Sequence, residues 1–251
     1  MVPVLRNKCG YLALVRRNKH NQGGEEGFML SGFINAVTII EETGKAEPEF
    51  WKAHDSLGNY LSQPLVSYKL QDTIVPFLRE WNSYRTPIAW NEFARGWTAD
   101  KQNVVKALSR KKLEDANSDN LLACARLFVH LLEVPGIGMT NASKLLALSL
   151  VDLCVRWDLR IIENFREGHP HRPGYLRMGR NKRQDLYYRF LLNQQEVANN
   201  LIQECMNRKR TTRDKAVKWL QQIPLRVPGS FSKREKPLAI LLDECNYHKT
   251  R

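Results

Sequence analysis

Apolar residues recur at helical spacing along most of this chain. Between residues 28 and 42, the side chains of Phe33, Val37 and Ile40 return every three or four positions, which places them on one face of a helix. The same pattern predicts further helices at residues 49–61, 70–81, 103–113, 121–133, 140–150, 159–166, 184–206 and 238–242. The sequence therefore predicts an all-α fold.

Two of these helices carry signals that refine the prediction. Pro76 lies inside the helix at 70–81 and should kink or interrupt it, because proline removes a hydrogen-bond donor and its ring crowds the preceding turn. Residues 117–119 offer side-chain caps for the helix at 121–133. Apolar positions cover more than half of the circumference of the helix at 121–133, which predicts that this helix is central and buried.

Length and composition limit the class of protein. A chain of 251 residues, 43% of them hydrophobic, is enough for one compact domain or two modest sub-domains. Lys and Arg total 39 against 26 acidic residues, a formal net charge of +13. Such an excess favours a polyanionic partner, because each cation placed at a phosphate releases condensed counterions. A basic surface also serves solubility alone, so the charge favours nucleic acid without assigning it.

Several classes of protein are not indicated. No stretch approaches the roughly 18 uninterrupted apolar residues that a membrane span needs. The apolar run at residues 11–15 is too short for a signal peptide. The five cysteines form no Cys-x-x-Cys pair, so we expect neither a disulfide framework nor a metal site, and no cofactor. We expect a cytoplasmic, nucleoid-associated monomer with no membrane partner.

One short motif carries candidate chemistry. Residues 134–138 read Val-Pro-Gly-Ile-Gly between two predicted helices. Pro135 would end the first helix, while Gly136 and Gly138 permit backbone angles and close approach that a side chain forbids. The main-chain amides of residues 136–139 would then point outward at the start of the second helix, where a phosphate oxygen is readily bound. An ordinary turn between two helices is the alternative interpretation.

With its surroundings, the motif resembles the helix-hairpin-helix DNA glycosylase superfamily. In that family an Ala-containing helix follows the hairpin, and an apolar residue and a catalytic aspartate come after a loop. Here Ala142 lies in the second helix, and Trp157 and Asp158 follow the loop, with Asp158 20 residues after Gly138. The resemblance covers about residues 118–166, and the flanking regions are similar only in being basic and helical.

The resemblance implies a fold and an activity. We expect a helical barrel at residues 28–150 that ends in the hairpin, a second basic helical sub-domain at residues 151–251 with residues 1–27, and a cleft between them. The hairpin would grip double-stranded DNA while a modified or mispaired base is flipped out. The carboxylate of Asp158 would stabilise the positive charge that develops on the sugar as the N-glycosidic bond breaks. Asp158 is also a plausible cap for the predicted helix at 159–166.

Departures from the family pattern leave alternatives open. Members that also cut the DNA backbone have a nucleophilic lysine early in the second hairpin helix, where this chain has Thr140. Lys144 lies one turn later, where a solvated lysine is the ordinary interpretation. We therefore expect a DNA glycosylase without lyase activity. The alternatives are a non-catalytic DNA-binding protein and a glycosylase/lyase that uses Lys144. Asp152, in the loop at 151–156, is expected to be exposed.

The remaining candidate residues are contacts to DNA or to the flipped base. Residues 166–189 are rich in Arg and Lys and are interpreted as a basic, exposed loop that leads into the predicted helix at 184–206. The residues expected to bind DNA are Pro135, Gly136, Ile137, Gly138, Thr140, Arg172, Arg177, Arg180 and Lys182. The aromatic residues Trp90, Trp97 and Trp157 are candidates for a base pocket, with core packing as the alternative.

Overall fold

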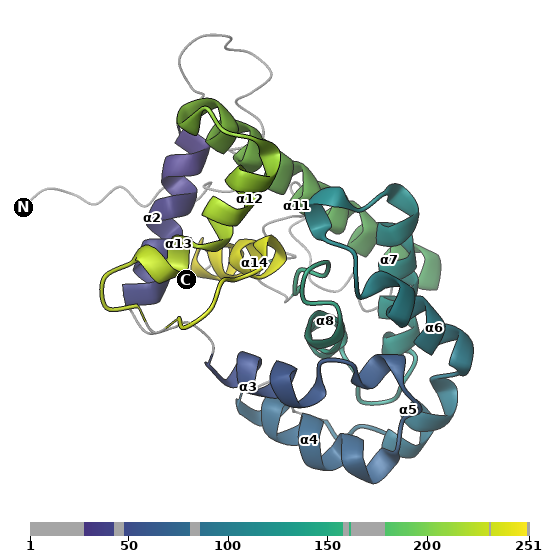
Figure 1. Cartoon of the computed structure of the whole chain (residues 1–251). Coiled ribbons are helices and arrows are strands. Elements are labelled where there is room, and N and C mark those ends of the chain that lie inside the picture. Colours follow the sequence, from purple (N-terminus) through teal and green to yellow (C-terminus); the bar gives the residue numbers. More distant parts are fainter. Residues whose placement is uncertain are drawn as a thin grey trace, which may run out of the picture.

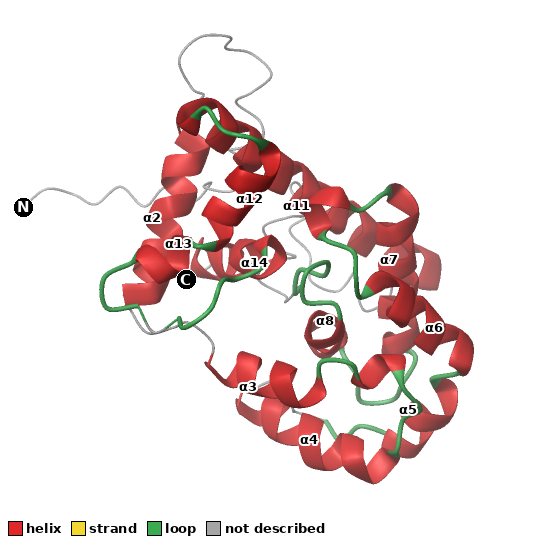
Figure 2. Cartoon of the chain, viewed as in Figure 1, coloured by secondary structure: helices red, strands yellow, loops and turns green. Residues whose placement is uncertain are grey.

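The computed structural model describes residues 28–42, 48–80, 86–157, 161, 179–230 and 232–249. All regular structure in these ranges is helical, which confirms the predicted all-α class (Figure 2). The α-helices are α2 (Phe28–Glu42), α3 (Pro48–Leu57), α4 (Ser67–Glu80), α5 (Trp90–Gly96), α6 (Ala99–Leu108), α7 (Ser118–Leu132), α8 (Met139–Ser149), α11 (Arg180–Lys209), α12 (Arg213–Gln221), α13 (Ile223–Arg226) and α14 (Leu238–Lys249). Two 3-10 turns, η2 (Tyr60–Ser62) and η3 (Leu113–Asp115), connect them.

Helix α7 is the centre of the fold, as its apolar circumference predicts. Its start is fixed by a reciprocal capping box: Asn117 accepts a hydrogen bond from the Asn120 amide at 2.9 Å, and the Asn120 side chain accepts one from the Asn117 amide at 3.3 Å. The helix packs against α6, α8 and α11. Its inward residues are fully buried, including Leu121 and Phe128.

The helices form two groups that meet along α7 and α11 (Figure 1). Helices α3, α4, α5 and α6 lie with α8 in one group, and α2, α12, α13 and α14 lie with α11 in the other. The placement of α2 differs from the predicted grouping of residues 28–150, because α2 packs on α11, α13 and α14. Its apolar periodicity indicates a buried face, but it does not say which helices cover that face. One continuous hydrophobic cluster spans both groups.

The long helix α11 corrects another prediction. The predicted helix at 184–206 was expected to follow a basic, exposed loop, but residues 180–183 of that loop form the first turn of this helix. Arg, Lys and Gln are good helix formers, and the ion pair between Asp185 and Arg189 at 2.9 Å adds support one turn apart. A pattern search based on apolar spacing misses this part because the first turn is entirely polar or basic.

Buried ion pairs tie the second group together. The ammonium of Lys236 bonds Glu41 of α2 at 2.7 Å and Glu244 of α14 at 2.8 Å, and all three side chains are buried. Burial alone would lower the pKa of Lys236, but the two carboxylates outweigh it and raise the pKa. A second buried pair joins Arg156, in the loop after α8, to Asp243 of α14. These pairs fix the positions of α2, α14 and the loop.

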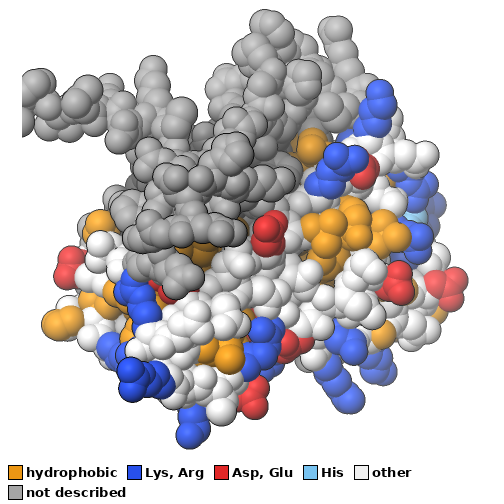
Figure 3. Space-filling view, turned by 90° about the horizontal axis from the view of Figure 1, so that it is seen from above, with side chains coloured by type: hydrophobic (Ala, Val, Ile, Leu, Met, Phe, Trp, Pro, Cys, Tyr) orange, Lys and Arg blue, Asp and Glu red, His pale blue; other side chains and the backbone are white. Residues whose placement is uncertain are grey.

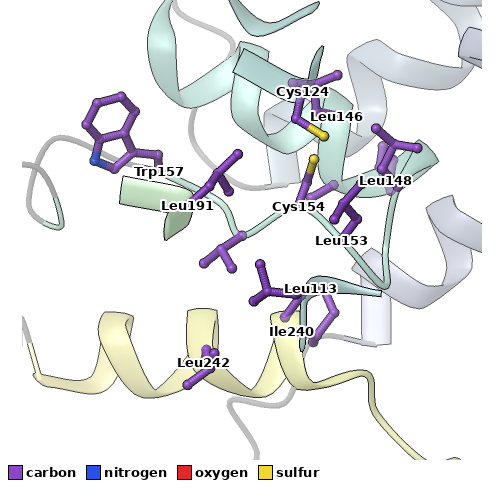
Figure 4. Close-up of a cluster of buried hydrophobic side chains, with 14 of the residues drawn as sticks. Leu113, Cys124, Leu146, Leu148, Leu153, Cys154, Trp157, Leu191, Ile240 and Leu242 are labelled. Carbon is purple, nitrogen blue, oxygen red and sulfur yellow. The ribbon is translucent and has the colours of Figure 1, made fainter. Parts of the chain in front are cut away.

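Membrane and disulfide features agree with the composition. In the part of the chain that the structure describes, no helix combines the length and apolar character needed to span a bilayer. The four described cysteines are buried free thiols. The sulfur atoms of Cys124 and Cys154 face each other inside the core (Figure 4). The hydrogen bond between Cys124 and Cys154, together with burial, raises the pKa of Cys124, so this thiol stays protonated and unreactive.

Candidate functional site

The connection between α7 and α8 is a tight turn. The amide of Ile137 donates to the carbonyl oxygen of Val134 at 3.0 Å, and Gly136 has a φ of +86°. With Pro135 at the second position and glycine at the third, this is the arrangement of a type II β-turn. The prediction that the Ile137 amide points outward to a phosphate is therefore wrong, because that amide closes the turn.

The segment before α5 holds this turn in place. The amide of Ala89 donates to the Pro135 carbonyl oxygen at 3.0 Å. A Cβ atom on Gly136 would lie only 2.1 Å from the carbonyl oxygen of Pro87. Gly136 is therefore required by the positive φ and by contact within the protein, and its absent side chain does not serve DNA approach. The sequence gives no sign of this contact, because it joins residues almost 50 positions apart.

Gly138 has a different environment. It is the exposed N-cap of α8, and a Cβ atom there would have no described atom within 4 Å. As a glycine, Gly138 has no side chain that could cap this end of α8. The first turn also has no acidic residue, and Thr140 is half-exposed. The amino end of α8 is therefore open, and its partial positive charge suits an anion.

A cation lies at the end of α7 that leads into the turn. Arg180, the first residue of α11, contacts Glu133 at 2.9 Å, and His130 bonds the other oxygen of Glu133 at 3.1 Å. Arg180 is about half exposed. Burial is the main cause of a lowered pKa for His130, so this imidazole favours its neutral form. The structure thus brings Arg180 next to the hairpin, although 42 residues separate Arg180 from Gly138 in the sequence.

The other predicted basic contacts are less well placed. Lys182 is exposed in the first turn of α11, whereas Arg172 and Arg177 lie outside the described residues. On the face drawn in Figure 3, Lys and Arg side chains form separate groups with Asp and Glu among them. The basic side chains drawn on that face therefore do not form a single patch.

The chain just before Asp158 is firmly anchored, whereas Asp158 itself lies outside the described residues. The amide of Trp157 donates to the hydroxyl of Ser143 at 2.9 Å, and that hydroxyl lies 3.1 Å from the Trp157 carbonyl oxygen. The indole, labelled in Figure 4, is completely buried, and it stacks on Phe190 with ring centres 5.4 Å apart. Trp157 is therefore a core residue, and it is wrong as a candidate for an open base platform.

The two other tryptophan candidates are also buried. Trp97 is 3% exposed, and its indole nitrogen donates to the Leu61 carbonyl oxygen at 2.7 Å. Trp90 is 8% exposed but borders a surface hollow of about 490 Å³. The exposed Tyr68 and Arg95 line the same hollow. Core packing is thus the main role of both tryptophans, and only Trp90 borders an open space.

Two polar residues near α8 differ from expectation. Lys144 is 7% exposed, so the interpretation as a solvated lysine is wrong. Asp152 is only half-exposed, because its loop turns inward and its carbonyl oxygen accepts a hydrogen bond from the Leu113 amide at 2.8 Å. Burial raises the pKa of Asp152, although Lys112 and His54 act in the opposite direction. The spacing of apolar residues in the sequence does not show that a loop with polar residues turns into the protein.

Comparisons with known proteins assign no family. No family model, curated protein or solved structure matches this chain. The functional interpretation therefore rests on the turn, on the open end of α8 and on the charged residues around them.

Proposed function

We propose that this protein binds double-stranded DNA through the turn between α7 and α8. The observation that carries the proposal is the exposed amino end of α8 at Gly138, which the turn presents without an N-cap side chain and without an acidic residue in the first turn. Backbone amides at a helix start bind phosphate oxygens without using a charged side chain. The hydrogen bond from the Ala89 amide fixes the turn, so the amides keep their direction before DNA arrives. Binding therefore costs little conformational entropy.

Basic residues around the turn supply the attraction over longer distances. Arg180 and Lys182 begin α11 beside the end of α7. Arg180 is paired with Glu133, so a phosphate would compete with that carboxylate for the guanidinium. Phosphate contacts of this kind fix position on the duplex and carry no base information. Binding should therefore weaken steeply as salt rises.

We further propose that the bound protein excises a modified or mispaired base, with Asp158 as the catalytic carboxylate. Two features support this part. Asp158 follows Trp157, whose backbone is anchored to α8 by Ser143, so the chain enters position 158 from a fixed point near the hairpin helix. A carboxylate held there would stabilise the charge that develops on the deoxyribose and would help to activate water.

The excision proposal is tested with a panel of duplexes that each carry one damaged or mismatched base. Hot alkali then cuts the strand wherever a base has been removed. We expect strand cleavage on at least one duplex and a loss of about 100- to 1000-fold in rate for Asp158→Asn. Asn caps a helix as well as Asp does, so folding and DNA binding should persist. An excision rate that Asp158→Asn leaves unchanged would contradict the catalytic role.

The second candidate function is DNA binding without catalysis. It is favoured by the burial of Trp90, Trp97 and Trp157, since none of these side chains is free to stack on a flipped base. A folded protein that binds duplex DNA through Gly138 and excises no base from the whole panel would establish this alternative.

A further inference from the structure

A second cavity lies at the opposite end of α8 from the hairpin. It has a volume of about 690 Å³ and is bordered by the end of α3, the η2 turn, the end of α6 and the loop after α8. Its polar lining includes His54, Gln63, Ser109, Ser149 and Asp152. Helix α8 has 11 residues, so roughly 16 Å separates its two ends. The cavity is therefore distinct from the proposed DNA contact.

Three helices end at this cavity. Helix α3 ends at Leu57, Ser109 is the C-cap of α6, and α8 ends at Ser149, and all three residues line the cavity. The carboxyl end of a helix carries a partial negative charge of roughly half an electron. Basic residues lie in two of these last turns, His54 in α3 and Lys106 in α6, whereas α8 has no basic residue in its last turn. The helix ends, that of α8 above all, therefore favour a negative potential inside the cavity.

The side chains reinforce that sign. None of the described residues that line the cavity is Lys or Arg. Asp55 is already neutralised, because Arg234 bonds its two oxygens at 2.9 Å and 2.7 Å and holds its pKa well below the usual range. Asp152 has no comparable ion-pair partner among the described residues; burial raises its pKa, and the charges of Lys112 and His54 act in the opposite direction. Its carboxylate is therefore the acidic group of this cavity that is left without a direct ion-pair partner.

A buried hydroxyl group in the same wall indicates a ligand. Ser149 is 6% exposed, and its hydroxyl oxygen has no hydrogen-bond partner among the described residues. A buried hydroxyl without a partner is unfavourable, and a ligand that bonds it removes that cost. Ser149 ends α8 and Asp152 follows three residues later in the loop, and both line the cavity, so its wall offers a hydroxyl and a carboxylate to one ligand.

We propose that this cavity binds a small organic cation that carries a primary ammonium or guanidinium group. The N–H donors of such a group match the Asp152 carboxylate, the Ser149 hydroxyl and the carbonyl groups at the helix ends. The volume is typical of small-molecule sites and far exceeds that of a bare metal ion. Within the described ranges, no group of His, Cys, Asp and Glu residues is arranged to hold a metal. Phosphorylated ligands are disfavoured by the negative potential.

Calorimetric titration of the full chain tests the proposal, with agmatine and putrescine as probes and with sorbitol, AMP and potassium chloride as comparison solutes. We expect saturable binding of at least one of the two amines, and none of the comparison solutes should bind. Asp152→Asn should weaken amine binding by about tenfold or more, because it removes a charged hydrogen bond. Ser149→Ala should weaken it by a smaller factor and provides a second variant if one substitution disturbs folding.

The matched control is Asp185→Asn, which removes an exposed carboxylate on α11 away from the cavity. It should leave amine binding unchanged. The proposal is overturned if neither amine binds, if sorbitol, AMP or potassium binds as well as the amines, or if Asp152→Asn and Asp185→Asn have equal effects. Thermal unfolding of each variant confirms that a loss of binding is not a loss of fold.

Discussion

The Cα atom of Gly136 lies against the backbone of Pro87, so closely that an added methyl group would meet the Pro87 carbonyl oxygen at 2.1 Å. Gly138, two residues later, has open space where its side chain would be. The two glycines of the motif therefore have separate roles. Gly136 shapes the turn from inside the protein, and Gly138 leaves the start of α8 accessible from outside.

The first prediction separates the two glycines by stability. Gly136→Ala should destabilise the protein by about 3 kcal/mol or more, because it combines a positive φ with a backbone clash. Gly138→Ala should change the free energy of unfolding by about 1 kcal/mol or less. Urea unfolding followed by circular dichroism measures both. Equal values for the two variants would mean that the contact between Gly136 and Pro87 is not formed.

The second prediction concerns the anchor before Asp158. Ser143→Ala leaves the buried Trp157 amide without its acceptor, which should cost about 1–3 kcal/mol of stability. The control is Ser56→Ala, because Ser56 is exposed and bonds only the Lys52 carbonyl oxygen of its own helix. That change should stay within about 0.5 kcal/mol. Chemical unfolding measures the free energy of unfolding of both variants. If Ser143→Ala leaves it unchanged, the hydrogen bond to Ser143 does not anchor Trp157.

The third prediction follows from the raised pKa of Asp152. The folded state holds the proton on this carboxyl more tightly than the unfolded state does, chiefly because of burial. The stability that this contributes is complete below the unfolded pKa of about 3.9 and is lost as pH rises through the folded pKa. Asp152→Asn should therefore raise the melting temperature at pH 7 by about one to three degrees.

The gain from Asp152→Asn should shrink as the pH is lowered, because the wild-type carboxyl group then takes up its proton. Calorimetric melting curves at several pH values measure it. If the variant is less stable than the wild type at pH 7 and equally stable in acid, the pKa of Asp152 is lowered by folding, which contradicts this prediction. A cavity residue that costs stability when unliganded agrees with a binding role for that residue.

The fourth prediction concerns lyase chemistry. A lysine nucleophile must reach the sugar, and Lys144 is only 7% exposed. Borohydride should therefore trap no covalent complex between the protein and DNA that contains an abasic site. Efficient trapping in the wild type that disappears in a folded Lys144→Met variant would instead support the lyase alternative.

The sequence predicts the parts of this fold that depend on local pattern. Helices α2, α7 and α8 are found close to their expected bounds, because their apolar spacing and caps are clear. Short or strongly polar helices are missed, namely α5, α12, α13 and the start of α11. Apolar spacing carries no signal in such segments. Pro76 lies inside α4 without ending it, since packing on α3 and α5 supports the helix on both sides of the proline.

The candidate site is only partly predictable for the same reason. The turn at 134–138 is visible in the sequence because proline and glycine have fixed conformational preferences. The contact between Pro87 and Gly136, the pairing of Arg180 with Glu133 and the inward course of Asp152 all depend on tertiary packing. Residue type alone therefore predicts the wrong role for the Ile137 amide, which closes the turn, and for Trp157, which is a core residue.

The most direct test of the account is the affinity of Gly138→Val for duplex DNA, measured by fluorescence anisotropy over a range of salt concentrations. The valine side chain would stand where a phosphate approaches α8, in a space that no described atom occupies, so the fold should be retained. The control is Gly32→Val, at an equally open position on α2. We predict that the dissociation constant rises by about tenfold or more for Gly138→Val, with a shallower salt dependence, and stays unchanged for Gly32→Val. A folded Gly138→Val protein with wild-type affinity and salt dependence would contradict the assignment of the hairpin as the DNA-binding element.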